Sequence, residues 1–262
     1  MISKSNIKVE KAKHPDMILI PEGDYIIGIS DSQINHLVRT ELWATEWYER
    51  DMFMIEQPQH KFHLKAFQLA RTPVTNAEYY SFIWLTGYRV PREWIGFHYP
   101  DGQANHPVTG VSKIDAHAYI DWLNTQLNAN YRLPTEAEWE CAARGGDTRL
   151  YPWGEDFDPW RCNTVESGKR GTTAVGEYSP SGDSPFGVVD MAGNVWEWTC
   201  SLLKSYPYDP KDGREDDKGG GKFVIRGGSW YYSHKLARST CRESALHNFS
   251  SPALGFRLAK DL

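Results

Sequence analysis

The chain of 262 residues has a formal net charge of −5, with 40% hydrophobic and 13% aromatic residues. That length and apolar content suffice to bury a core, and the acidic balance argues against nucleic acid as a partner. No apolar run reaches the roughly 20 residues of a membrane helix, so no membrane partner is expected. The opening segment, MISKSNIKVEKAKHPD, lacks the apolar stretch of a secretory leader, which predicts a cytoplasmic protein.

The N-terminal part alternates strand and helix signals. Residues 17–30, MILIPEGDYIIGIS, hold two apolar runs around a Pro-Glu-Gly-Asp turn, which predicts a hairpin. Residues 31–57 carry apolar side chains among charges at helical spacing and predict an amphipathic helix or an ordered insertion. Residues 60–71 predict a strand, and the alternation in HKFH favours a half-exposed strand over a metal site for His60 and His63.

Three helices are predicted from Thr75, Ser112 and Thr135, each a hydroxyl residue followed three positions later by an acid. In TNAE and TEAE the hydroxyl can cap an amide while the glutamate reaches back, and SKID is a weaker version of the same box. Beyond residue 150 glycine, proline and tryptophan dominate, and residues 211–222 are expected to form a solvated loop. We therefore predict one α+β domain over residues 1–262, with two or three helices, short antiparallel strands and long ordered loops.

The sequence holds four cysteines, Cys141, Cys162, Cys200 and Cys241. None belongs to a C-x-x-C pair, so a zinc ribbon or a thioredoxin-type motif is not expected. Because no export signal is visible, we expect these thiols to be reduced.

Five motifs occur in a fixed order: RLPTEAEWECAARGG at 132–146, YPWG at 151–154, GVVDMAGNVWEWT at 187–199, RGGSW at 226–230 and GFRLA at 255–259. With these motifs the sequence resembles the formylglycine-generating-enzyme or sulfatase-modifying-factor family over nearly its whole length. The resemblance implies a variant of the C-type-lectin fold, in which residues 31–57 are an insertion.

The resemblance also implies where oxidase chemistry would lie. The enzymes of this family oxidise a substrate cysteine with copper held by two cysteine thiolates, soft ligands that suit Cu(I). Counted from Trp230, the matching positions are Tyr232 and Ala237, and Cys241 is the remaining sulfur of the segment. One thiolate cannot reproduce a two-thiolate site, so neither copper nor the inherited oxidase activity is expected. The related sulfoxide synthases hold iron with histidines from an additional helical domain, for which we find neither room nor an H-x-x-x-H pair.

The motif DMAGNVWEW implies a structural calcium site, because the family binds calcium there through carboxylate and carbonyl oxygens. The matching positions are Asp190, Gly193, Val195 and Glu197. The alternative is that Glu197 caps loop amides or pairs with an arginine. The family's second calcium site matches Asn163, with the Thr164 carbonyl beside it; an expected acid is replaced near Ser167, so we expect this site to be empty or weak.

The stretch between RGGSW and GFRLA is predicted to be the functional surface. Its flanks are typical of terminal strands, and its tyrosine, serine, asparagine and histidine are the residue types that binding loops favour. The candidate ligand-binding residues are Tyr231, Tyr232, Ser233, His234, Lys235, Glu243, Leu246, His247, Asn248 and Phe249. The core is expected to hold Trp153, Trp196, Trp198 and Trp230. Bidentate hydrogen bonds that fix loops are expected from Arg226, Arg238, Arg242 and Arg257.

We interpret the chain as a non-catalytic member of this family that binds an unidentified protein or small molecule through residues 231–249. The variable proteins of diversity-generating retroelements resemble the same fold and vary in this segment, so a diversified receptor is one form of this interpretation. A regulatory subunit that docks another protein is the second alternative. An oxidoreductase of the formylglycine-generating or sulfoxide-synthase type, with altered site chemistry, is the third.

Overall fold

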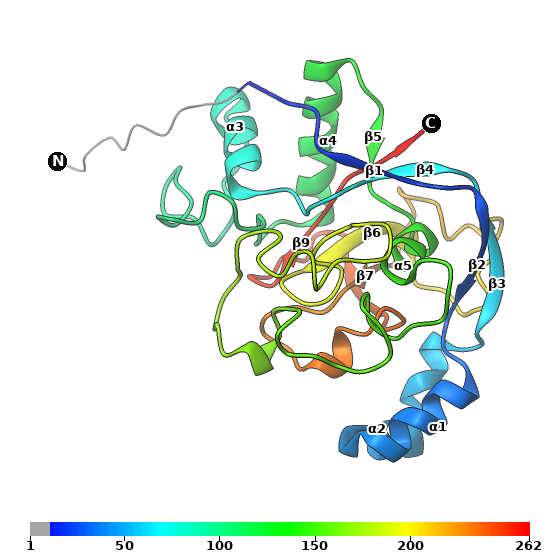
Figure 1. Cartoon of the computed structure of the whole chain (residues 1–262). Helices are drawn as coiled ribbons and strands as arrows, with labels where there is room; N and C mark the ends of the chain where they lie inside the picture. The colour runs from blue at the N-terminus through cyan, green and yellow to red at the C-terminus, as the bar shows by residue number, and fades with distance from the viewer. Residues whose placement is uncertain (1–10) are drawn as a thin grey trace.

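The computed structural model describes residues 11–262, so most of the segment examined for a leader lies outside the described residues. The first sheet holds β1 (Met17–Ile20), β4 (Phe67–Ala70), β10 (Ala259–Asp261) and β5 (Tyr131–Arg132), all antiparallel. Because β1 and β10 both pair with β4, the two ends of the described chain meet in one sheet (Figure 1).

A second sheet pairs β2 (Gly23–Ile27) with β3 (His60–Leu64). The predicted hairpin at residues 17–30 is therefore wrong, because β1 and β2 enter different sheets on either side of Pro21. Ile20 and Ile27 nevertheless lie in the same buried cluster, so both runs bury apolar side chains although the two strands do not pair. The strand predicted at 60–71 is broken into β3 and β4 for the same reason.

The third sheet has the order β8 (Glu243–Leu246), β7 (Lys222–Arg226), β6 (Trp196–Leu202) and β9 (Leu254–Gly255). Its pairs are antiparallel except β6 with β9, which run parallel. The sheet lies at the centre of the molecule (Figure 1). RGGSW begins at the last residue of β7, Arg226, and WEW opens β6.

Five α-helices occur within residues 11–262, more than the two or three expected, because the insertion folds into two of them. They are α1 (Asp31–Thr40), α2 (Leu42–Glu49), α3 (Asn76–Thr86), α4 (Lys113–Leu127) and α5 (Glu136–Arg144). The predicted capping boxes are confirmed at Thr75, Ser112 and Thr135. The SKID box is fully formed, since the Asp115 carboxylate accepts from the Ser112 amide at 2.8 Å and caps α4.

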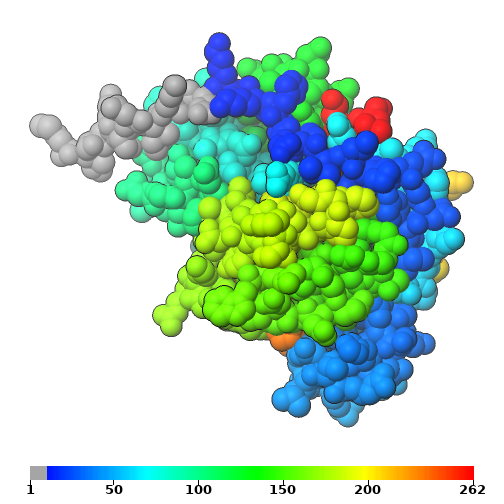
Figure 2. All heavy atoms as spheres, viewed as in Figure 1, coloured from blue at the N-terminus to red at the C-terminus, as the bar shows by residue number. Residues whose placement is uncertain are grey.

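The insertion, residues 31–57, forms a lobe that projects from the body, and part of the C-terminal segment, drawn in orange, lies beside it (Figure 2). It comprises α1, α2 and a short 3₁₀ helix, Met52–Glu56. Ile34, Leu37 and Trp47 pack there with Leu150 and Tyr151 of the body. The insertion is therefore attached through its own apolar core and not only through its two chain ends.

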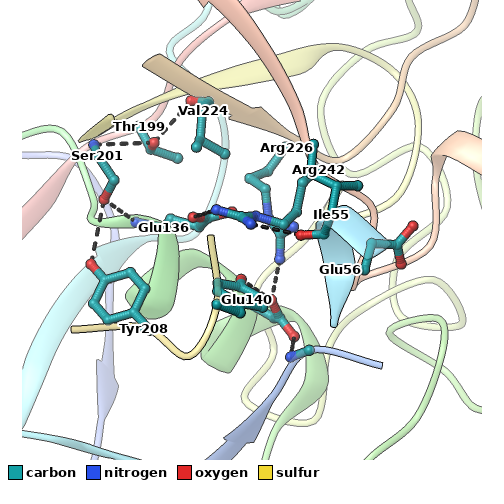
Figure 3. A network of polar contacts seen from close by, with 12 residues as sticks. Ile55, Glu56, Glu136, Glu140, Thr199, Ser201, Tyr208, Val224, Arg226 and Arg242 are labelled. Carbon is teal, nitrogen blue, oxygen red and sulfur yellow. Dashed lines mark hydrogen bonds and ion pairs between the residues drawn. The ribbon is translucent and has the colours of Figure 1, made fainter. Parts of the chain in front are cut away.

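Helix α5 is buried along its whole length and contacts β2, β3, β6 and β7. Each of its two fully buried acids pairs with an arginine that comes from the C-terminal segment (Figure 3). Glu136 accepts from Arg242 at 2.6 and 2.8 Å, and Glu140 pairs with Arg226 and Arg144. Burial disfavours the charge of Glu140, but the two arginines outweigh burial and hold its pKa below the usual range. The pairs thereby fix β7 and the loops after it on a rigid helix.

Most residues of the loop at 211–222 are exposed, as predicted, but some of its charged side chains bond to the body of the protein. Arg214 is fully buried and donates to the Ser205 carbonyl at 2.8 Å, while its neighbour Glu215 accepts from the Ser201 hydroxyl at 2.9 Å. Lys113 of α4, also buried, pairs with Asp217. The loop is therefore solvated as predicted, but Arg214, Glu215 and Asp217 are not free surface charges, because their contacts hold the loop in place.

None of the helices in residues 11–262 combines the length and apolar character that crossing a membrane requires.

Candidate functional site

The turn that follows β7 determines where the C-terminal loop lies. Gly228 has φ +71°, and a Cβ at this position would approach the Ala237 Cα to 2.8 Å. Only glycine allows that backbone conformation together with such close approach. RGGSW therefore seats the loop that carries residues 231–237 directly on the end of the strand.

The two positions matched to the copper thiolates have opposite surroundings. Ala237 is fully buried and packs with Cys162, whereas the Tyr232 side chain is 41% exposed. Burial raises the pKa of the Cys162 thiol to about 12 and that of Cys241 still higher, so neither is a thiolate at neutral pH. All four cysteines are free thiols, as expected. The donor set does not fit a two-thiolate copper site.

A pocket of about 270 Å³ opens beside Tyr232. Its walls come from strands β6, β7, β8 and β9 and from the loops between RGGSW and β9. Trp196 forms part of it and has its ring centroid 6.2 Å from that of Tyr232. The remaining lining residues are Ile225, Leu236, Glu243, Ser244, Ala245, Phe249, Ser251 and Leu254. The pocket is thus mainly apolar, with one carboxylate.

The structure divides the ten predicted ligand-binding residues into two groups. The exposed group is Tyr231, Tyr232, Glu243, Leu246, His247, Asn248 and Phe249. The half-buried group is Ser233, His234 and Lys235. Three of the exposed group, Tyr232, Glu243 and Phe249, line the pocket together. Between the two groups residues 237–242 are buried, so the segment is not a continuous surface loop.

His234 is held from both sides of its ring. Its Nδ1 lies 2.9 Å from Glu166 and its Nε2 lies 3.2 Å from Glu41 of the insertion. Phe157 stacks on the imidazole at 4.3 Å, and the Trp43 indole N–H lies 3.2 Å from Nε2. Because both ring nitrogens have partners, His234 fixes the loop. It is less available to a ligand than the composition of residues 231–249 predicted.

Sequence analysis missed these partners of His234. Glu41 and Trp43 lie more than 190 positions away in a segment predicted only as an insertion. No spacing rule connects residues so far apart, and the apolar side chains at helical spacing in residues 31–57 were the one available signal that the insertion packs on something.

Arg238 makes the second link between the insertion and the C-terminal segment. Its guanidinium donates to Glu56 through two bonds of 2.7 Å, and both side chains are buried. The Thr240 hydroxyl adds a third bond to Glu56, at 2.6 Å. The predicted role of the arginines, to fix loops through bonds to carbonyls or carboxylates, is confirmed here, at Arg242 and at Arg257. It is also confirmed at Arg226, which bonds several carbonyls as well as Glu140. Trp196 and Trp198 are buried as expected, while Trp153 and Trp230 are half-buried.

The residues matched to the calcium site are only partly suited to a cation. Burial raises the pKa of Asp190 to about 6, and its carboxylate accepts from the Gly176 amide at 2.9 Å. Glu197, however, is bound by Arg257 through two bonds of 2.6 Å and by the Trp139 indole at 2.8 Å. A calcium ion would have to share Glu197 with a guanidinium, which is the arrangement given above as the alternative.

The turn itself has the shape that the motif requires. Gly193 has φ +76°, and a Cβ there would lie 2.4 Å from the Asn163 carbonyl oxygen, so Gly193 and Asn163 are in close contact. At the second matched site the Asn163 amide oxygen accepts from the Ser167 hydroxyl at 2.8 Å. That hydrogen bond engages the oxygen atom that would have to bind the cation. No group of three or more His, Cys, Asp or Glu side chains that could hold a metal occurs in the described part of the chain.

These features define a C-type-lectin-like fold with a mainly apolar pocket on its C-terminal face. The chain belongs to the family described as sulfatase-modifying factor enzyme 1-like, whose model matches residues 3–262. It is 36% identical over 267 residues to the formylglycine-generating enzyme of Streptomyces coelicolor, covering 79% of this chain and 82% of that one.

Two solved structures are similar along nearly the whole chain. PvdO from Pseudomonas aeruginosa is 27% identical with a TM-score of 0.72, covering 99% of this chain and 100% of that one. Treponema denticola variable protein 1 is 23% identical with a TM-score of 0.73, covering 94% and 95%. The second similarity concerns the fold alone. The family thus includes proteins named as enzymes and shares its fold with a protein named as variable.

Proposed function

We propose that this protein is a non-catalytic member of its family and that it binds a protein or small-molecule ligand through residues 231–249. The proposal rests on the two residues that occupy the positions matched to the copper thiolates. Ala237 is a buried methyl group, and Tyr232 offers an exposed ring at the mouth of an apolar pocket. The two thiolates that copper-dependent oxidation would need are absent at these positions. An exposed aromatic ring, which a ligand can contact, lies at one of them instead.

Exposure supports the same surface. The side chains of Tyr231, Tyr232 and Phe249 are 63%, 41% and 50% exposed. Large rings at a protein surface are the residue types that most often dominate binding energy, at about 2 kcal/mol or more for a central anchor. Their ordered surroundings limit the entropy lost on binding, because the loop is fixed by Gly228, His234 and Arg238.

The test removes the three rings together. Replacing Tyr231, Tyr232 and Phe249 with alanine should abolish capture of a partner from native lysate. The melting temperature should barely move, because exposed substitutions outside the core usually cost within about 0.5 kcal/mol each. The matched control replaces three exposed apolar residues far from the segment in sequence, namely Trp84, Ile95 and Phe97.

Two results would contradict the proposal. If the triple variant unfolds while the control variant does not, the three rings belong to the core. If it stays folded and retains every wild-type partner, the functional surface lies elsewhere. The pocket of about 340 Å³ lined by Lys11, Glu78 and Trp122 would then be the next candidate.

A further inference from the structure

The pocket beside Tyr232 contains one charged side chain, the carboxylate of Glu243. Glu243 lies at the start of β8, and its side chain reaches solvent at the pocket. Within residues 11–262 no basic group comes into ion-pair distance of it. Burial raises its pKa against the opposing effects of the Ser244 amide and Lys222, so its charge is incompletely compensated.

The pocket also offers aromatic faces. Tyr232 and Phe249 line it from two loops, and Trp196 forms part of the wall. A cation placed over such rings is attracted to their negative faces, by about 0.5–2 kcal/mol depending on desolvation. A long basic side chain has an apolar stem as well as a charged end, so it can satisfy the rings and the carboxylate at once.

The dimensions favour one side chain over a whole metabolite. Ligand pockets usually hold roughly 300–1,000 Å³, and this one holds about 270 Å³. Exposed apolar groups continue beyond it, since Tyr231 and Leu246 are 63% and 51% exposed. A small anchor pocket surrounded by further contact surface is typical of a protein partner.

The neighbouring backbone offers a way to position such a partner. β8 ends the third sheet on one side and pairs with β7 alone among the described strands. An end strand presents alternate N–H and C=O groups that can bond to an added extended segment. Glu243, Ser244 and Ala245 of this strand also line the pocket, so an added segment would pass beside it.

We propose that an extended segment of a partner protein adds to the free edge of β8 and inserts a lysine or arginine side chain into this pocket. The basic head group pairs with Glu243 and the stem packs on Tyr232 and Phe249. This inference deepens the proposed function and rests on it, because it names the kind of partner that the same surface takes.

The experiment measures the fluorescence anisotropy of labelled peptides of alternating valine and threonine with one central residue. Peptides with central lysine or arginine should bind, and the peptide with central norleucine, which has a similar stem without charge, should bind about tenfold more weakly. Glu243→Gln should remove that preference, and Glu243→Lys should transfer it to a peptide with central glutamate. Glu49→Gln, an exposed acid at the end of α2, is the control and should change nothing.

Two further measurements distinguish the parts of the proposal. Methylation of alternate peptide nitrogens should abolish binding in one register and leave it intact in the other, because an end strand bonds to every second residue. Free butylammonium should compete far more weakly than the peptide. Equal competition would show that the pocket takes a small cation and would overturn strand addition.

The remaining outcomes separate this inference from the proposed function. Equal binding of the lysine and norleucine peptides, lost on replacing Tyr232 and Phe249 with alanine, would overturn the basic anchor while leaving a binding face. Failure of both basic peptides to bind at millimolar concentration would overturn the inference. The lysate experiment with the three-ring variant would still decide separately whether the face binds anything.

Discussion

The link between Glu56 and Arg238 gives a prediction whose size follows from burial. The two side chains are 1% and 0% exposed, and two bonds of 2.7 Å join them. Glu56→Gln would leave the guanidinium without a counter-charge, close to the rings of Trp43, Trp47 and Phe53. Breaking a buried pair by removing one partner costs about 3–5 kcal/mol. We expect a loss of that size in the free energy of unfolding from denaturant titration.

A second ion pair in the insertion serves as the control. Arg50 and Glu46 also lie 2.7 Å apart, but their side chains are 66% and 67% exposed. Glu46→Gln should therefore cost only about 0.3–0.5 kcal/mol. Comparable small losses in the two variants would refute the claim that burial makes Glu56 important.

A loss of 3–5 kcal/mol is a large part of the roughly 5–15 kcal/mol that stabilises most domains. A second variant therefore guards against a protein that simply does not fold. Replacing Glu56 with leucine and Arg238 with methionine removes both charges together. Because no buried charge is left uncompensated, this double variant should be more stable than Glu56→Gln alone.

Three further predictions concern chemistry, metal and pH. Incubation with copper and a cysteine-containing peptide should yield no formylglycine above a protein-free control, and an aldehyde detected by mass spectrometry would contradict the missing-thiolate argument. If Asp190 and Glu197 hold calcium, excess chelator should lower the melting temperature, since a cation bound only to the native state stabilises it. Asp190→Asn should then remove that sensitivity. Unchanged curves with no metal by elemental analysis would leave Glu197 as a partner of Arg257 and Trp139 alone. Burial opposes ionisation of Asp115, but hydrogen bonds from Arg89 and Ser112 outweigh burial and lower the pKa of its carboxyl group. The ionised Asp115 therefore stabilises the fold above its unfolded pKa of about 3.9, and this stabilisation is lost as the pH falls through the lower folded pKa. The difference in melting temperature between wild type and Asp115→Asn should shrink from about pH 6 to about pH 3, and a constant difference would contradict this assignment.

Local chemistry predicted the parts of this fold that depend on neighbours in sequence. The capping residues Thr75, Ser112 and Thr135 begin helices where expected, because a cap and its acid lie within one turn. The hairpin at residues 17–30 failed because a turn signal does not identify the partners of the strands that flank it. β1 finds β4 across about fifty residues, and that pairing is set by the common core and not by the turn.

The candidate site shows the same division. The composition of residues 231–249 indicated an exposed aromatic surface, and Tyr231, Tyr232 and Phe249 are exposed. It could not distinguish His234 from them, because the two acids that hold its ring lie 68 and 193 positions away. A histidine in a polar loop looks the same in sequence whether its ring faces solvent or two carboxylates.

The insertion thereby acquires a role that follows from its contacts. Glu41 bonds to His234 and Glu56 bonds to Arg238, so the insertion fixes the loop between Tyr232 and β8 at two points. A loop held in this way presents its rings in one arrangement, and releasing it would add an ordering cost to every binding event. Under conditions where Glu56→Gln is still folded, it should therefore weaken capture of a partner, although Glu56 lies outside the proposed contact surface. Unchanged capture by the folded variant would mean that Gly228 and His234 alone keep the loop in place.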